Sequence, residues 1–306
     1  MSRLHISTPE LDERNLSYEE YFRVIHVLLR HEALYLRKIH PNKSIDDIKA
    51  YPLIIIEKIV KITGTLYSVV VRNKDYVVSN IILRSLADII SSMILIYTEP
   101  DLEIKKIRHY LFIMDGLYGR MKNLPIDLKY DGKIQKEEYE QLKEQIDNAY
   151  NNYNEAYLLA KNEIQNLSIY KTHKQTIDIL INNRKWKFKD ISESNIKYYS
   201  WTELYSYANL PVDSVFFSLL SEFVHGLSTS NLLIDNTDET FEPILSIASS
   251  LIGKVLNLLN ILYSNEIPLI EDKMVSALYD DDLPVHYVKS ILSEFASRTN
   301  EKVAEN

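Results

Sequence analysis

Four polar residues stand out because each pair of them interrupts an apolar segment that is predicted to be helical. Arg84 and Asp88 interrupt one such segment, and Ser221 and His225 interrupt another. Residues four apart share one face of a helix, so the members of each pair can act together. If the two helices are neighbours, the four residues supply a cation, a carboxylate, a hydroxyl and an imidazole, which are groups that can move a proton. They are therefore the candidate catalytic residues.

The same residues also admit a non-catalytic interpretation, which we favour. Buried polar groups need hydrogen-bonding partners. Asp88 would orient His225, and Ser221 would complete the hydrogen bonding. Such a network fixes the register of two helices without any reaction. An enzyme would need His225 to line a cleft that water reaches, whereas a structural network would seal it.

Other catalytic and metal chemistries are less well represented. Glu222-x-x-His225 has the helical spacing of di-iron ligands, but the chain has no second motif of this kind. A Ser221, His225 and Asp88 triad would lack a glycine-rich elbow and an oxyanion hole. No phosphate loop, dinucleotide fingerprint or His-Glu-x-x-His motif is present. We predict no cofactor and no metal, with a metal-binding bundle as a remote alternative.

The segment 211–228, which carries half of this cluster, is predicted to be one continuous helix. Pro211 suits the first helical turn, where the N–H that proline lacks would have no intrahelical partner. Asp213 and Ser214 place short polar groups in that turn, where the helix dipole favours them.

The composition predicts helices joined by short polar links. The chain has 306 residues but only six glycines, which disfavours hairpins and glycine-rich nucleotide loops. It has no cysteine, which excludes disulfides and thiolate chemistry and fits a reducing cytoplasm. No apolar core of signal-peptide length follows Met1. We therefore expect a cytoplasmic protein.

One short segment is basic, although the chain as a whole is acidic. The formal net charge is −8, which argues against general nucleic-acid binding. In residues 184–189, however, basic residues alternate with Trp186 and Phe188. Such a run can contact phosphates or bases. We favour the alternative that it is a solvated segment whose two aromatic side chains point inward.

Apolar residues recur at the helical period along most of the chain. The predicted helices cover about 16–37, 52–73, 75–97, 101–122, 134–166, 176–182, 202–208, 211–228, 243–263 and 284–297. Neither an alternating strand pattern nor a Pro/Gly linker appears. We predict a single all-α domain of about eight to ten helices over residues 17–297, between a polar tail at 1–16 and a charged tail at 298–306.

The segment 134–166 differs from the other predicted helices because its apolar seam is narrow. The spacing of this seam is that of a coiled coil. Its members are Tyr139, Leu142, Ile146, Ala149, Tyr153, Ala156 and Ala160. We predict a long helix packed along one side, either protruding or pairing in a dimer.

Two predicted helices are long enough to span a bilayer. In 75–97, however, Arg84 and Asp88 would each cost roughly 2.5–3.5 kcal/mol at the bilayer centre. In 243–263, small and polar residues form one stripe, which is typical of an amphipathic helix. We therefore predict buried or amphipathic helices and no membrane association.

Two blocks of the sequence resemble a largely uncharacterised family of all-helical bacterial proteins. They are Ile82-Leu-Arg84-Ser85-Leu-Ala-Asp88, and Trp201 through Leu204 and Ala208 to Leu220-Ser221-Glu-Phe-Val-His225. The family pattern is an Arg-Ser-x-x-acid helix, a Trp and a Ser-x-x-x-His helix; its acid is usually Glu and here is Asp88. Such proteins are loosely grouped with HEPN-like domains, some of which are ribonucleases of toxin or phage-defence systems.

The resemblance implies an all-helical fold more than an activity. The nuclease motif of HEPN domains is Arg, four to six residues, and His, and no Arg in this chain precedes a His at that spacing. We therefore expect an interaction or regulatory module that forms a homodimer and has a possible protein partner. The alternative is a HEPN-like ribonuclease or nucleotide-processing enzyme that uses His225 with Arg84, Asp88 and Ser221.

Overall fold

Helices make up nearly all of the regular structure, which confirms the all-α prediction. The computed structural model describes residues 17–192, 195–211, 213, 216–217, 220–225 and 238–280. These residues form eleven α-helices, one π-helical segment and one isolated antiparallel bridge. Two of the eleven, α6 (Ser168–Thr172) and α10 (Ser221–His225), have only five residues. The number of longer helices therefore lies within the predicted range.

The contacts of the chain group it into two compact units, whereas we predicted a single domain over 17–297. Unit 1 contains residues up to 42, residues 52–98 and residues from 201 onward, and unit 2 contains residues 43–51 and 99–200. Only residues 98–101 separate the last helix of the 52–98 segment of unit 1 from the first helix of unit 2. A link this short has no composition that marks a boundary.

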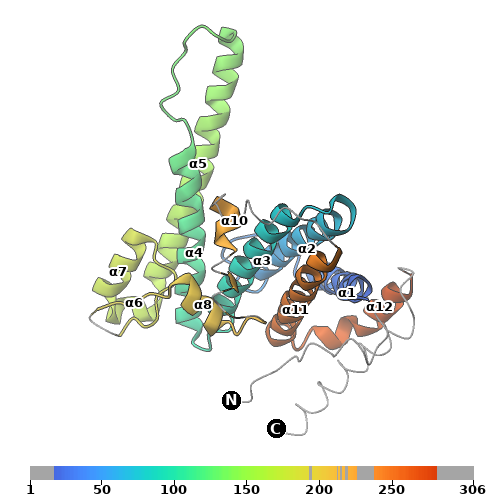
Figure 1. The fold of residues 1–306 in the computed structure, drawn as a ribbon. Helices are drawn as coiled ribbons and strands as arrows, with labels where there is room; N and C mark the ends of the chain where they lie inside the picture. The colour runs from blue at the N-terminus through green and yellow to red at the C-terminus, as the bar shows by residue number, and fades with distance from the viewer. Residues whose placement is uncertain are drawn as a thin grey trace. The chain divides into compact units, whose positions relative to one another are not determined.

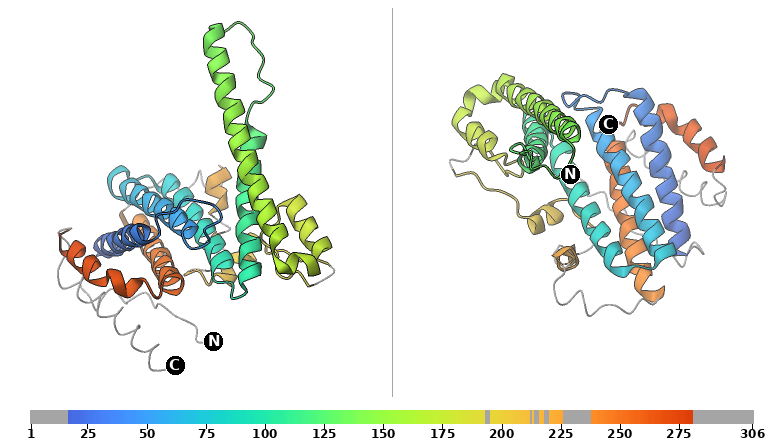
Figure 2. Two further views of the ribbon diagram at one scale, coloured as in Figure 1. Left: turned by 180° about the vertical axis from the view of Figure 1, so that it is seen from behind. Right: turned by 90° about the horizontal axis from the view of Figure 1, so that it is seen from above.

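Unit 1 is a helical bundle (Figure 1). In addition to α10, its elements are α1 (Tyr18–Ile39), α2 (Tyr51–Ser68), the π-helix η2 (Val69–Asn73), α3 (Tyr76–Tyr97), α8 (Trp201–Tyr207), α11 (Asp238–Leu262) and α12 (Ile267–Asp280). Helix α11 packs against both α1 and α3, and α12 packs against α1 (Figure 2). Helix α3 also contacts α8 and α10.

Helix α1 begins with a capping box. The Ser17 side chain accepts a hydrogen bond from the Glu20 N–H, and the Glu20 carboxylate accepts one from the Ser17 N–H. Further along α1, Nδ1 of His26 lies 2.9 Å from the Thr63 hydroxyl on α2. Burial lowers the pKa of His26 to about 4, so this contact uses the neutral imidazole.

Two helices of unit 1 are long and apolar enough to cross a membrane by length and composition. They are α3 and residues 241–262 of α11, and about half of each apolar window is buried within the structure.

The helix cap of α3 is Asp75, whose side chain accepts a hydrogen bond from the Val78 N–H. In α11 the predicted polar stripe includes Lys254, whose pKa is lowered by burial.

The predicted helix over 211–228 was wrong as a single continuous element. Pro211 and Asp213 are not helical, residues 216–217 are helical, and Leu220 forms a turn before α10. Arg84 donates a hydrogen bond of 2.7 Å to the Phe217 carbonyl. The Leu220 N–H still donates to the Phe216 carbonyl at 3.1 Å, with the spacing of an α-helical hydrogen bond. The remaining positions of 211–228 lie outside the described residues.

Several other boundaries differ from the predictions. Helix α11 begins at Asp238 rather than at residue 243, and Pro243 lies inside it. Helix α12 was not predicted, although it buries Ile270 and Met274. The predicted helix at 284–297 and both predicted tails lie outside the described residues.

Unit 2 is organised around a long antiparallel pair of helices, which Figure 1 shows in green. Helices α4 (Leu102–Asn123) and α5 (Lys136–Asn166) pack along each other, and α6 and α7 (Lys174–Asn183) follow. The α5 seam that suggested a coiled coil is buried at Ile146 and Ala160. Because α5 and α4 pack together within one chain, this seam does not require a dimer.

Side chains fix the remaining parts of unit 2 to α4. The Glu103 carboxylate accepts hydrogen bonds from the N–H groups of Ser168 and Ile169 at 2.9 Å each, at the start of α6. His109 is fully buried, and its Nε2 lies 2.7 Å from the Ile45 carbonyl. Burial lowers the pKa of His109 to about 4. The neutral imidazole therefore holds residues 43–51 on α4.

One carboxyl group in the core of unit 1 has an unusual environment. Glu32 on α1 is 2% exposed, and its Oε1 has no hydrogen-bond partner among the described residues. Burial raises the pKa of Glu32 to about 8, because the ionised form loses its hydration. Between the ordinary pKa and this value, Glu32 is protonated in the folded chain and ionised in the unfolded chain.

We predict that Glu32 makes the protein less stable as the pH rises from about 5 to 8. Unfolding releases a proton in this window, so the free energy of unfolding falls by about 1.4 kcal/mol per pH unit from this group. Glu32→Gln should remove this dependence and stabilise the protein by about 3 kcal/mol at pH 7. Urea unfolding followed by circular dichroism at several pH values measures the difference.

The matched control is Glu271→Gln, at an exposed position on α12. It should leave the pH dependence of stability as it is in the wild-type chain. Equal pH dependence for Glu32→Gln and the wild type would contradict the prediction.

Candidate functional site

Arg84 lies on α3 and reaches three groups of unit 1 at once. Its Nε lies 3.5 Å from Oδ2 of Asp88, one helical turn along α3. Its Nη1 donates to the Phe217 carbonyl at 2.7 Å, and its guanidinium carbon lies 4.8 Å from the centroid of the Tyr205 ring. The side chain is 11% exposed. A buried cation is tolerated when it is paired and hydrogen-bonded, and Arg84 meets both conditions.

Asp88 is shared between Arg84 and a tyrosine of α8. The Tyr205 hydroxyl donates to Oδ1 of Asp88 at 2.5 Å. Burial raises the pKa of Tyr205 well above its usual value. The Asp88 carboxylate, which accepts a hydrogen bond from the Tyr205 hydroxyl, raises this pKa further. Tyr205 therefore stays protonated as a donor at neutral pH. We call Arg84, Asp88, Tyr205 and the Phe217 carbonyl the arginine cluster.

Aromatic rings enclose the arginine cluster on the α8 side. The Tyr205 ring lies 5.4 Å from the Phe217 ring and 6.0 Å from the Trp201 ring, between centroids. Tyr205 and Phe217 are almost fully buried, with exposed fractions of 1% and 0%. The Asp88 side chain is 31% exposed. The cluster is thus enclosed around Arg84 but open to water at one carboxylate.

The structure brings together part of the predicted site. Arg84 and Asp88 pair as expected, and α10, which begins at Ser221, contacts α3. Ser221 is half-buried, and no hydrogen bond to Arg84 or Asp88 is described for it. His225 ends α10, but its side chain lies outside the described residues. The prediction that Asp88 orients His225 stays a prediction.

Two members of the arginine cluster were missed by the sequence analysis. The sequence analysis singled out neither Tyr205 nor Phe217. A signal did exist for Tyr205, because it lies four residues after Trp201 and so shares a face of the same helix. No local pattern identifies a backbone carbonyl as the partner of a distant arginine.

In chemical terms, the arginine cluster positions groups well but offers little for a reaction. The guanidinium and the carboxylate each have an intramolecular partner, and the tyrosine has no tendency to act as a base near neutral pH. Within the part of the chain that the structure describes, no group of three or more potential ligands could hold a metal ion. These contacts hold α3, α8 and residues 216–217 together.

We predict that Arg84→Lys destabilises unit 1 by about 2 kcal/mol, since a buried carbonyl loses its donor and the ring loses a planar cation. Urea unfolding measures the change. Arg72→Lys, at an exposed position on η2, is the matched control and should stay within about 0.5 kcal/mol of the wild type. If both variants behave alike, Arg84 does not tie these segments together.

No family model, curated protein or solved structure matched this chain.

Proposed function

We propose that this chain is a non-catalytic helical interaction module and that the arginine cluster is a structural tie inside it. The proposal rests on the observation that Arg84 and Asp88 both form contacts with other residues of the same chain. Two of these contacts, from Arg84 to the Phe217 carbonyl and from the Tyr205 hydroxyl to Asp88, each join a different segment to α3. Such contacts fix the position of helices and leave the charged groups engaged.

We further propose that the module works as a cytoplasmic homodimer through an apolar corner of unit 1. Nε2 of His40, at the end of α1, lies 3.1 Å from the Glu266 carboxylate between α11 and α12. Three exposed apolar side chains occur close to this contact in the chain. They are Ile39, Ile261 and Leu269, with exposed fractions of 40%, 47% and 70%. A contiguous patch of exposed apolar side chains favours a protein interface, and these three residues would belong to it.

A HEPN-like ribonuclease or nucleotide-processing enzyme is the second candidate. The exposure of Asp88 supports it, because a carboxylate that water reaches can also meet a substrate. This enzyme would use His225 as its proton-transfer group, with Arg84, Asp88 and Ser221 around it. We rank it second because the contacts of Arg84 and Asp88 are already those of a structural tie.

We predict that the protein does not cleave RNA. Wild-type protein and His225→Ala should leave a set of 5′-labelled single-stranded and hairpin RNAs equally intact on a denaturing gel. The two chains must first show the same helical circular dichroism. If the wild type cleaves RNA and His225→Ala abolishes this cleavage, the protein is a ribonuclease rather than an interaction module.

We predict a particle of twice the chain mass of 35.8 kDa in size-exclusion chromatography with light scattering. Leu269→Glu should halve the particle mass, because a charge at the interface centre must lose its hydration. The matched control is Ile179→Glu on α7, a residue that is 49% exposed in unit 2, and it should leave the mass unchanged. A monomeric wild type at every concentration would contradict the dimer.

A further inference from the structure

A short two-stranded ribbon in unit 2 interrupts the helical pattern. Phe188 and Tyr198 form the antiparallel bridge. One backbone hydrogen bond of 2.8 Å lies on each side of it, from the Lys189 N–H to the Lys197 carbonyl and from the Tyr199 N–H to the Lys187 carbonyl. We call residues 185–189 and 197–199 the basic ribbon. The two flanking bonds fix which residues face each other across it.

The two faces of the basic ribbon have opposite character. Successive side chains of an extended strand point to opposite faces. Trp186 and Phe188 point inward, as predicted, with exposed fractions of 6% and 0%. The alternate positions Lys187 and Lys189 are half-exposed, and Lys197, which faces Lys189, is exposed. The outer face therefore gathers lysines from both strands.

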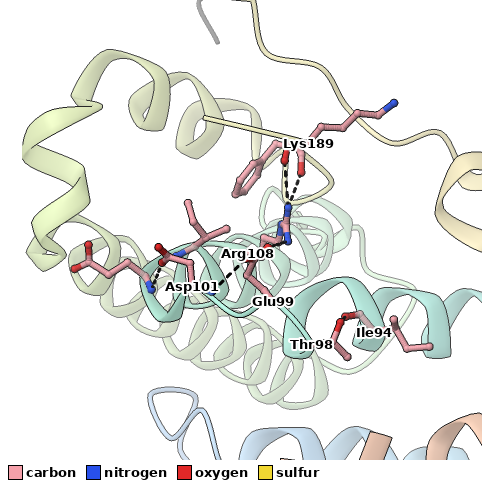
Figure 3. A network of polar contacts seen from close by, with 9 residues as sticks. Ile94, Thr98, Glu99, Asp101, Arg108 and Lys189 are labelled. Carbon is pink, nitrogen blue, oxygen red and sulfur yellow. Dashed lines mark hydrogen bonds and ion pairs between the residues drawn. The ribbon is translucent and has the colours of Figure 1, made fainter. Parts of the chain in front are cut away.

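A buried arginine holds the basic ribbon in place from its inner side. Arg108 on α4 donates to the carbonyls of Phe188 at 3.2 Å and Lys189 at 3.5 Å, and its Nη1 lies 2.5 Å from Oε2 of Glu99. Figure 3 shows the Lys189 side chain extending away from Arg108. Because Arg108 fixes the backbone, the lysines are presented on a pre-formed surface.

Two tyrosines lie next to lysines of the basic ribbon. Tyr199 is opposite Lys187 and so shares the outer face, whereas Tyr198 is opposite Phe188 and shares the inner face. The Lys189 ammonium lies 5.1 Å from the centroid of the Tyr199 ring, and the Lys185 ammonium lies 5.9 Å from that of Tyr198. Tyr198 is 36% exposed and Tyr199 is half-exposed. Each pair thus combines a positive charge with an aromatic ring.

The charge of this region is opposite to that of the chain. Residues 184–200 contain five basic and two acidic side chains, whereas the whole chain has a formal net charge of −8. Charges farther away than about 8 Å are largely screened at physiological ionic strength. An approaching anion therefore meets the local positive charge rather than the acidic average.

We propose that the basic ribbon binds single-stranded nucleic acid, with its lysines on phosphates and its tyrosines against bases. Single strands expose base faces that can stack on aromatic rings, whereas a duplex stacks its bases on one another. The ribbon belongs to unit 2, so this activity is separate from the proposed dimer corner of unit 1. It also requires no catalysis.

The first experiment measures the binding of a 5′-fluorescein-labelled 12-nucleotide oligouridine by fluorescence anisotropy over a range of KCl concentrations. Lys189→Gln with Lys197→Gln should weaken binding by about tenfold near 0.1 M salt. The slope of log affinity against log salt should become shallower by about 1.4, since each lost phosphate contact contributes about 0.7 for a single strand.

The matched control removes two exposed lysines elsewhere in unit 2. The Lys133 and Lys136 side chains are 84% and 71% exposed, so Lys133→Gln with Lys136→Gln makes the same change in net charge. This variant should keep the wild-type affinity and salt slope. Equal weakening by both double variants would show a general charge effect and overturn the proposal.

A second variant tests the aromatic part of the basic ribbon. Tyr198→Leu keeps an apolar side chain but removes the ring, and it should weaken oligouridine binding by about tenfold without changing the salt slope. Lack of wild-type binding at 0.05 M KCl would overturn the proposal. Wild-type affinity in Tyr198→Leu, with equal competition by oligoglutamate, would identify an acidic polypeptide as the ligand and would also overturn it.

Discussion

In each unit of this protein, one buried arginine joins a segment far away in the chain to a helix. Arg84 in unit 1 pairs with Asp88, lies over the Tyr205 ring and donates to the Phe217 carbonyl. Arg108 in unit 2 pairs with Glu99, lies over the Phe188 ring and donates to the Phe188 carbonyl. In both, a carboxylate, a ring and a backbone carbonyl share one guanidinium. The planar donor fork of arginine makes this combination possible, and lysine has no equivalent.

Buried backbone carbonyls explain why such contacts are needed. A helix satisfies its own carbonyls, but a segment that leaves the helix and stays buried must find donors elsewhere. The residues around Phe217 and Phe188 instead take a donor from a neighbouring helix. Their folding is therefore coupled to the placement of that helix.

The sequence predicted the long helices well because their signals are local. Ser17 with Glu20, and Asp75, cap α1 and α3 as short polar side chains do in general. Tertiary features were predicted poorly, because partners lie far away in the chain. No local signal marks the break at Leu220, and the seam of α5 does not say whether its partner is α4 or a second chain.

The candidate site shows the same division between local and distant information. The Arg84–Asp88 pair follows from a spacing of four residues, and the structure confirms it. Tyr205, 117 residues from Asp88, completes the arrangement and changes its meaning. A carboxylate paired with a histidine would suggest proton transfer. A carboxylate that accepts a hydrogen bond from a buried tyrosine suggests a structural role.

The buried arginines and the surface lysines of this protein differ in what they present to a partner. Arg84 and Arg108 are buried and engaged with neighbouring groups, so their charges contribute little to what a partner meets. The lysines of the basic ribbon alternate with buried aromatic residues and thus stay at the surface by the geometry of the strand alone. The alternation that buries Trp186 and Phe188 also directs Lys187 and Lys189 outward. Anchoring the ribbon and presenting its charge are therefore two results of one sequence pattern.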